Sequence, residues 1–227
     1  MSRIVVASID NIWSRHFFNK LSHLLGPDKV KWVKDDGELP FVLDHKPTWV
    51  FFFHWSSKVS NIVFENNRCV VLHTSNLPEG RGGSPIQNQI REGVVSSKVN
   101  LIQMAEGFDT GGIYLSKEVT LQGNALDIWM MIADQGAELA DKCVNENPNP
   151  KPQSVSIKPA FKRIKNNSIL FDLPDILDVY REIQMVDAPG YPDAFVKIGK
   201  YTVQFSRPKL INDKEMICDA RISCEEK

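Results

Sequence analysis

Short apolar runs alternate with stretches of helical periodicity along the first 146 residues. The run 3–9 predicts a buried strand, and from Trp13 to Leu25 apolar residues recur at helical spacing until Gly26-Pro27 ends the helix. Further strands are predicted at 29–33, 47–53, 69–73, 99–105 and 113–121. Strands that alternate with helices in this way indicate an α/β fold with a mostly parallel sheet.

The remaining pattern predicts three more helical segments and a break. They are a helical turn at 59–64, a helix at 84–91 opened by Ser84-Pro85, and an amphipathic helix at 124–144. The stretch 145–152 reads NENPNPKP, and its prolines forbid a continuing helix. We therefore expect a Rossmann-like domain at 1–147 and a small C-terminal α+β extension at 148–227. The extension should contain a helix at 174–185, a hairpin of strands 194–198 and 201–205, and a frayed end from Cys224.

Composition is that of an ordinary globular protein. The 227 residues, 42% of them hydrophobic and 24% charged, are enough to bury a sizeable core. A net charge of -1 argues against a general nucleic-acid binder. No apolar run approaches the roughly 20 residues that span a bilayer, and the N-terminal run is too short for a signal peptide. Four cysteines without CxxC spacing favour reduced thiols and no metal site, so we expect a cytoplasmic protein. Because no apolar run is long enough, we expect no membrane contact.

One stretch organises the candidate chemistry. It reads VVLHTSNLPEGRGGSPIQN, from Val70 to Asn88, and it is a strand that delivers His73 to a loop rich in glycine and proline. Ligand sites of open α/β sheets lie just beyond the carboxyl ends of the strands, where such a side chain is well placed. A capping or packing histidine is the alternative interpretation.

Two neighbouring features support a site at His73. A second loop, 106–112, interrupts the strands that flank it and carries Asp109, which could face the imidazole or could instead form an Asx turn. Arg81 lies between glycines beside His73 and could clamp phosphate or carboxylate groups, although a lone loop arginine is by default a surface residue.

Two further loops leave the predicted sheet. The loop 8–11 lacks the GxGxxG of a dinucleotide site, so a nicotinamide cofactor is not supported, and Asp10 there could simply cap the following helix. The strand 47–53 ends in HWSSK, where Ser56 or Ser57 could cap the turn at 59–64.

Three segments carry a resemblance to a known family: 73–78 (HTSNLP), 81–87 (RGGSPIQ) and 107–111 (GFDTG). Together they resemble the formyltransferases that use 10-formyltetrahydrofolate, which act on methionyl-tRNA, glycinamide ribonucleotide or amino sugars. The resemblance covers residues 1–146. The wording of 72–88 is most similar to a branch with sugar-nucleotide formyltransferases of pseudaminic acid pathways and formylation domains of peptide synthetases.

The resemblance implies roles for particular residues. It assigns His73 to oxyanion stabilisation and proton handling, and Asp109 to orienting the histidine or a water, with no metal. It implies that 10-formyltetrahydrofolate is bound by Trp55, Ser56, Ser57, Glu106, Gly107 and Phe108, and the acceptor by Asp10, Arg81, Gln87 and Tyr191. Tyr191 belongs to a YP-x-AF segment that often helps form the acceptor cleft in amino-sugar formyltransferases, although it and Phe195 could be purely structural.

One position departs from the family pattern. The family carries an asparagine two residues before the histidine, on the same face of the strand, whereas Val71 stands here and cannot donate a hydrogen bond. Asn76, a backbone N–H of the glycine-rich loop, or His73 itself could replace the missing donor. Asn76 is therefore the third catalytic candidate.

The resemblance favours formyl transfer to a nucleotide-linked amino sugar. It is also compatible with a homodimer. A formyltetrahydrofolate hydrolase is one alternative, although such hydrolases are expected to carry a preceding regulatory domain and this chain starts directly with a strand. A methionyl-tRNA formyltransferase lacking a tRNA-binding domain is another, although the C-terminal segment, too small for such a domain, favours the amino sugar. A non-catalytic folate-binding protein is supported only by Val71.

Overall fold

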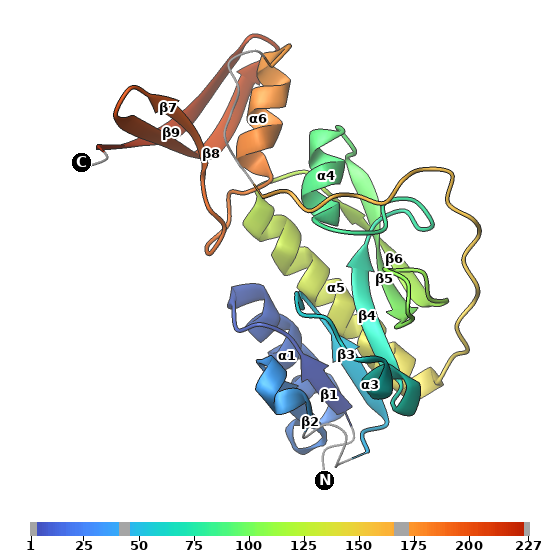
Figure 1. The fold of residues 1–227 in the computed structure, drawn as a ribbon. Coiled ribbons are helices and arrows are strands. Elements are labelled where there is room, and N and C mark those ends of the chain that lie inside the picture. Colours follow the sequence, from blue (N-terminus) through green and yellow to red (C-terminus); the bar gives the residue numbers. More distant parts are fainter. Residues whose placement is uncertain (1–3, 41–45, 166–172, 225–227) are drawn as a thin grey trace.

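The computed structural model describes residues 4–40, 46–165 and 173–224, and its centre is a six-stranded sheet (Figure 1). The strands are β1 (Ile4–Ala7), β2 (Val30–Val33), β3 (Trp49–Phe52), β4 (Cys69–Thr74), β5 (Ser96–Gln103) and β6 (Ile113–Thr120), in the order β2-β1-β3-β4-β5-β6. The first four in this order are parallel, while β5 and β6 run antiparallel to their neighbours. The predicted mostly parallel sheet is confirmed.

The strands are connected by helices that begin close to where the pattern predicted. The helices are α1 (Ile12–Leu25), α3 (Asn61–Asn66), α4 (Pro85–Arg91), α5 (Ala125–Glu146) and α6 (Ile176–Gln184), with 3₁₀ turns η1 (Pro27–Lys29) and η2 (Asp36–Glu38).

Two capping alternatives are wrong. Asn11, not Asp10, caps α1 by accepting a hydrogen bond from the Ser14 N–H. Ser60 stands at the N-cap of α3, so neither Ser56 nor Ser57 caps that helix.

Both faces of the sheet are covered. Side chains alternate along each strand, so Val6, Phe51 and Leu72 enter a large cluster with α1 and α5, while Phe52 enters a smaller one on the opposite face. Burial on both faces explains why β1 and β3 are continuously apolar. Helix α5 lies so close to β4 that a Cβ on Gly136 would be 2.2 Å from the Leu72 side chain, so only glycine fits there.

The chain that follows α5 contacts the loop after β4, which carries Arg81, and the loop after β5, which carries Asp109. After α5 it runs along the β5–β6 side of the sheet and then past β4 towards α6 (Figure 1). Residues 151–164, which we call the strap, form isolated bridges at Ile113 and at Gly82, through Lys151 and Phe161. The strap thereby connects the sheet with the C-terminal extension.

The C-terminal extension is a small antiparallel sheet with one helix, as predicted. Its strands are β7 (Ala194–Ile198), β8 (Tyr201–Asn212) and β9 (Glu215–Cys224), and α6 packs between this sheet and α4. The prediction that the chain frays from Cys224 is wrong for Cys224 itself, which is the last residue of β9 and pairs with Tyr201 of β8. The predicted frayed residues 225–227, and Arg3 of the first strand, lie outside the described residues. The boundary at 147/148 stays a prediction, because the large cluster also includes Met185 and Val196.

Within the described residues, no helix is long and apolar enough to cross a membrane. Cys69 and Cys143 are buried thiols, and burial raises the pKa of each to about 12.

Candidate active site

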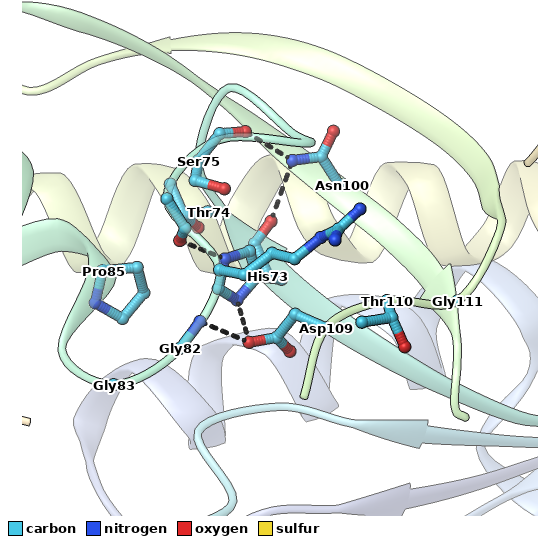
Figure 2. A network of polar contacts seen from close by, with 12 residues as sticks. His73, Thr74, Ser75, Gly82, Gly83, Pro85, Asn100, Asp109, Thr110 and Gly111 are labelled. Carbon is cyan, nitrogen blue, oxygen red and sulfur yellow. Dashed lines mark hydrogen bonds and ion pairs between the residues drawn. The ribbon is translucent and has the colours of Figure 1, made fainter. Parts of the chain in front are cut away.

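His73 lies near the end of β4 with both ring nitrogens engaged. Its residue surface is 5% exposed, and Nε2 lies 3.0 Å from the Gly80 carbonyl oxygen. A carbonyl can only accept, so Nε2 carries the hydrogen of this bond. Nδ1 faces Asp109, with 3.4 Å between Nδ1 and Oδ2 (Figure 2). Both predicted residues are therefore brought together in one site.

Asp109 does not form the Asx turn considered as its alternative. Its Oδ2 accepts a hydrogen bond of 3.0 Å from the distant Gly82 N–H, and its side chain is 16% exposed. Its backbone is left-handed, with φ of 54°, a conformation that aspartate adopts more readily than most residues. The carboxylate thus links the loop after β4 to the loop after β5.

The Asp109 loop reaches His73 from the other end of β4. Because β5 is antiparallel to β4, Gln103 pairs with Val70, and Met104 N–H bonds to the Cys69 carbonyl oxygen at 2.9 Å. The loop then folds back over the sheet until Asp109 meets His73. The position of Asp109 consequently depends on contacts that hold this loop.

Gln153 of the strap supplies several of these contacts. Its Nε2 donates to the carbonyl oxygens of Asp109 at 2.9 Å and Gly111 at 2.7 Å. Its Oε1 accepts from Arg81, with Nε at 3.1 Å and Nη2 at 2.7 Å. Arg81 is therefore not a free surface residue. Gln153 could not be found from the sequence, because a lone glutamine after a proline belongs to no motif.

Asn100 is a second residue that sequence reasoning missed. It is 1% exposed and lies opposite His73 on β5. Its Nδ2 donates to the carbonyl oxygens of His73 at 3.2 Å and Ser75 at 2.7 Å (Figure 2), and its Oδ1 accepts from Ser116. An asparagine inside the apolar run VNLI was the signal that could have found it.

Val71 and the proposed substitute donor lie apart. Val71 is half-buried and packs against the smaller cluster, as do Trp55 and Met104. Asn76 is exposed, and its Nδ2 lies 3.4 Å from the Ser96 carbonyl oxygen. No hydrogen bond found among the described residues joins Asn76 to His73, so its catalytic role stays a prediction.

The residues expected to bind the folate lie on two loops. Trp55 is half-buried, its ring edge lies against Phe52, and its indole N–H has no hydrogen-bond partner among the described residues. Ser56, Ser57, Glu106 and Gly107 are exposed. Phe108 is 86% exposed, which is unusual for so large an apolar side chain.

Half-buried His54, which is not among the predicted site residues, lies just after the end of β3. Asn11 Nδ2 donates to His54 Nδ1 at 3.1 Å, so Nε2 carries the ring hydrogen and donates to the Tyr191 hydroxyl at 3.3 Å. Trp13 and Trp129 stack on each other and contact the imidazole edge-on. Burial among these rings lowers the pKa of His54 to about 4.

The predicted acceptor-binding residues fall into separate groups. Tyr191 and the buried Gln87 lie together near His54, and burial raises the pKa of Tyr191 while the Gln87 side chain opposes that rise. Asp10 instead pairs with Arg15 and Lys34, whose hydrogen bonds lower the pKa of its carboxyl to about 2. Within the described residues, no group of three His, Cys, Asp or Glu could hold a metal ion.

The fold and this site define an α/β protein with a buried His–Asp pair at the carboxyl end of a parallel strand. Residues 60–128 match the family model described as formyl transferase, and 165–223 match the model of the methionyl-tRNA formyltransferase C-terminal domain. A solved methionyl-tRNA formyltransferase from Clostridium thermocellum is 30% identical, with a TM-score of 0.91, and the match covers 99% of this chain and 100% of that one. This chain belongs to the formyltransferase family.

Two further relatives differ in name and in extent. A methionyl-tRNA formyltransferase of Campylobacter lari is 30% identical over 155 residues, which cover 67% of this chain and 51% of that protein. The chain thus spans about half the length of this and similar curated relatives that it matches. An N-formyltransferase from Helicobacter canadensis, solved with folinic acid and dTDP-3-aminofucose, is 15% identical with a TM-score of 0.66, over 97% of this chain and 100% of that one. That last likeness is one of fold.

Proposed function

We propose that this protein transfers the formyl group of 10-formyltetrahydrofolate to the amine of a nucleotide-linked amino sugar. The observation that carries the transfer step is the buried His73–Asp109 pair, with Nδ1 and Oδ2 3.4 Å apart. Membership in the formyltransferase family supports the formyl-folate donor. The sugar acceptor is supported by the resemblance of residues 72–88 and by the ligands of the H. canadensis protein.

The reaction needs a hydrogen-bond donor and a proton acceptor. The amine attacks the formyl carbon, the bond from that carbon to N10 breaks, and the amine loses a proton while N10 gains one. Imidazole suits both tasks because it titrates near neutral pH. His73 Nε2–H, held by the Gly80 carbonyl in this structure, is the donor that turns to the developing oxyanion. Asp109 orients the ring at Nδ1 or holds a water that relays the proton.

The folate is assigned to the side of the site that carries two aromatic residues. Phe108 and Trp55 lie on separate loops and offer ring surfaces against which a pterin or aminobenzoyl group can pack. Ser56 and Ser57 are exposed, so their backbone groups can reach the pterin, whereas the Gly107 carbonyl oxygen already accepts a hydrogen bond from Thr110.

The acceptor's phosphates are assigned to Arg81. Its hydrogen-bond partners, Gln153 and the Ser154 carbonyl, are neutral, and no carboxylate is found paired with it among the described residues. A shallow pocket of about 270 Å³ lies between Arg81, Phe108 and Lys158. Two cations at one pocket suit a diphosphate, which a guanidinium can bind through paired N–H groups.

Methionyl-tRNA is the second candidate acceptor. The observation in its favour is the match of 165–223 to a methionyl-tRNA formyltransferase C-terminal domain, together with the names of the curated relatives. The net charge of -1 speaks against it, because tRNA binding usually needs a strongly basic surface.

A screen of acceptors with 10-formyltetrahydrofolate tests both candidates. Nucleotide-linked amino sugars and methionyl-tRNA are incubated separately with the protein, and mass spectrometry detects the gain of one formyl group. We expect formylation of an amino sugar, and its loss in His73→Ala and Asp109→Ala. Formylation of methionyl-tRNA alone would favour the second candidate. Release of formate without any acceptor would indicate a hydrolase, and folate binding without turnover a binding protein.

A further inference from the structure

We infer that Gln153 is a positioning residue, whose side-chain amide locks the Asp109 loop against the Arg81 loop and so sets the approach of Asp109 to His73. This inference rests on the proposed function, because it concerns the same His–Asp pair. Gln153 lies outside every motif that the chain shares with the family by sequence, and it touches neither ring nitrogen of His73.

The contacts require an amide at this position. A glutamine side chain has two N–H donors and one oxygen with two lone pairs. Gln153 directs the donors to the carbonyl oxygens of Asp109 and Gly111, and its oxygen takes both hydrogen bonds from Arg81. Glutamate could keep the Arg81 contacts but would have no donor, and lysine could donate but not accept. The Gln153 N–H groups therefore bind the Asp109 loop, while its oxygen binds Arg81, and the side chain joins the two loops.

The strap stays in place without this side chain. At one end, Lys151 and Ile113 exchange two backbone hydrogen bonds of 2.8 Å. At the other, Phe161 N–H donates to the Arg81 carbonyl oxygen at 2.7 Å, and Gly83 N–H donates to the Phe161 carbonyl oxygen at 3.0 Å. Gln153 is thus not needed to hold the strap on the protein, and its four side-chain contacts serve the two loops.

The Asp109 loop has reason to depend on such a lock. It comes from the far end of β4, and Asp109 takes the left-handed backbone conformation. The separation of 3.4 Å between His73 Nδ1 and Asp109 Oδ2 is already long for a hydrogen bond. A displacement of about 1 Å in a catalytic pair can cost on the order of 100-fold in rate. Release of the Asp109 carbonyl is therefore expected to lower turnover. Phe108 of the same loop lies on the side assigned to the folate, so folate binding is expected to weaken too, but by a smaller factor.

Two variants of Gln153 and one control test this in the whole protein. Gln153→Ala removes both halves of the bridge, and Gln153→Glu keeps the Arg81 half alone. Gln122→Ala removes an exposed glutamine whose side chain makes no hydrogen bond found among the described residues. We expect both Gln153 variants to lower kcat by about 10- to 100-fold and to raise KM for 10-formyltetrahydrofolate by a smaller factor, and the control to match the parent protein. Wild-type kcat in Gln153→Glu, or a loss of kcat that only tracks loss of folded protein by circular dichroism, overturns the inference.

A second measurement does not need turnover. In protein with 15N-labelled histidine, the ring-nitrogen signals of His73 are assigned by their loss in His73→Gln. We expect the Nδ1 signal of His73 to move in Gln153→Ala and to stay in Gln122→Ala, because only the first frees the Asp109 loop. An unmoved signal overturns the inference. If the parent protein formylates no acceptor, the proposed function fails, while this comparison still decides the role of Gln153.

Discussion

At the scale of single residues, Val71 decides how the site can stabilise an oxyanion. It points to the same face of β4 as His73 and packs half-buried among apolar side chains. An asparagine there would place an amide on that face but would bury polar atoms at a cost of about 1–3 kcal/mol. We expect Val71→Asn to lower the free energy of unfolding in urea without raising kcat.

The outcome that contradicts this expectation is informative. Removal of one oxyanion donor costs about 100- to 1,000-fold in other enzymes, so a vacant donor position leaves room for a large gain. A tenfold or greater rise of kcat in Val71→Asn would show that the position is vacant. Asn76→Ala is the companion variant, and unchanged turnover in it would remove Asn76 as the substitute donor.

His54 should make stability depend on pH. Its pKa of about 4 in the folded protein lies below the ordinary value, so between pH 4 and about 6.5 only the unfolded chain binds the proton. The stability that the neutral ring contributes is therefore complete above about pH 6.5 and is lost as the pH falls towards 4. We expect the parent protein to lose up to about 3 kcal/mol more than His54→Asn over this range. Urea unfolding at several pH values measures this difference, and parallel curves would refute it.

Residue type and neighbouring turn residues were enough to find part of the site. His73, Asp109 and Arg81 are chemically reactive or charged and lie in or just before loops that contain glycine or proline, so the sequence marks them. Asn100 and Gln153 act through hydrogen bonds to backbone carbonyls, and Gln153 reaches residues more than 40 positions away. Their partners exist only in the folded chain, which is why one sequence did not reveal them.

At the scale of elements, the buried strands were predicted well, whereas the exposed strand β9 was missed. Strands β1 and β3 are continuously apolar because both of their faces are covered. β9 was missed because most of its side chains are exposed, so it shows no apolar pattern. The path of the Asp109 loop could not be predicted either, since it follows from the antiparallel pairing of β5 with β4.

Gly82 should be essential for the close contact between the loop after β4 and the strap. Its φ is 103°, and an added Cβ would lie 2.5 Å from the Phe161 carbonyl oxygen. Gly190 has φ of 86° and nothing within 4 Å of such a Cβ, so Gly190→Ala carries backbone strain without the clash. We expect the Phe161 amide hydrogen, bonded to the Arg81 carbonyl, to exchange at least about tenfold faster in Gly82→Ala but not in Gly190→Ala. Equal protection in both variants would contradict the fit described here.

At the scale of the whole molecule, one apolar cluster joins the sheet to the C-terminal extension. Ile183 and Met185 from the end of α6, and Val196 from β7, belong to the same cluster as Leu72 and Trp129. Two polar contacts reinforce this junction: Arg91 of α4 pairs with Glu182 of α6, and Gln184 Nε2 donates to the Leu121 carbonyl oxygen at 3.1 Å. The extension is consequently tied to the elements that carry the site.

Met185 tests whether the two parts unfold together. It is fully buried in the shared cluster, so Met185→Ala should cost about 2–5 kcal/mol. All five tryptophans lie at or before Trp129, whereas Ile217 and Ile222 report on β9 through their methyl NMR signals. In a cooperative molecule both probes give one urea midpoint, and the substitution moves them together. If the β9 signals shift while tryptophan fluorescence does not, the extension is a separate folding unit, as the boundary predicted at 147/148 would require.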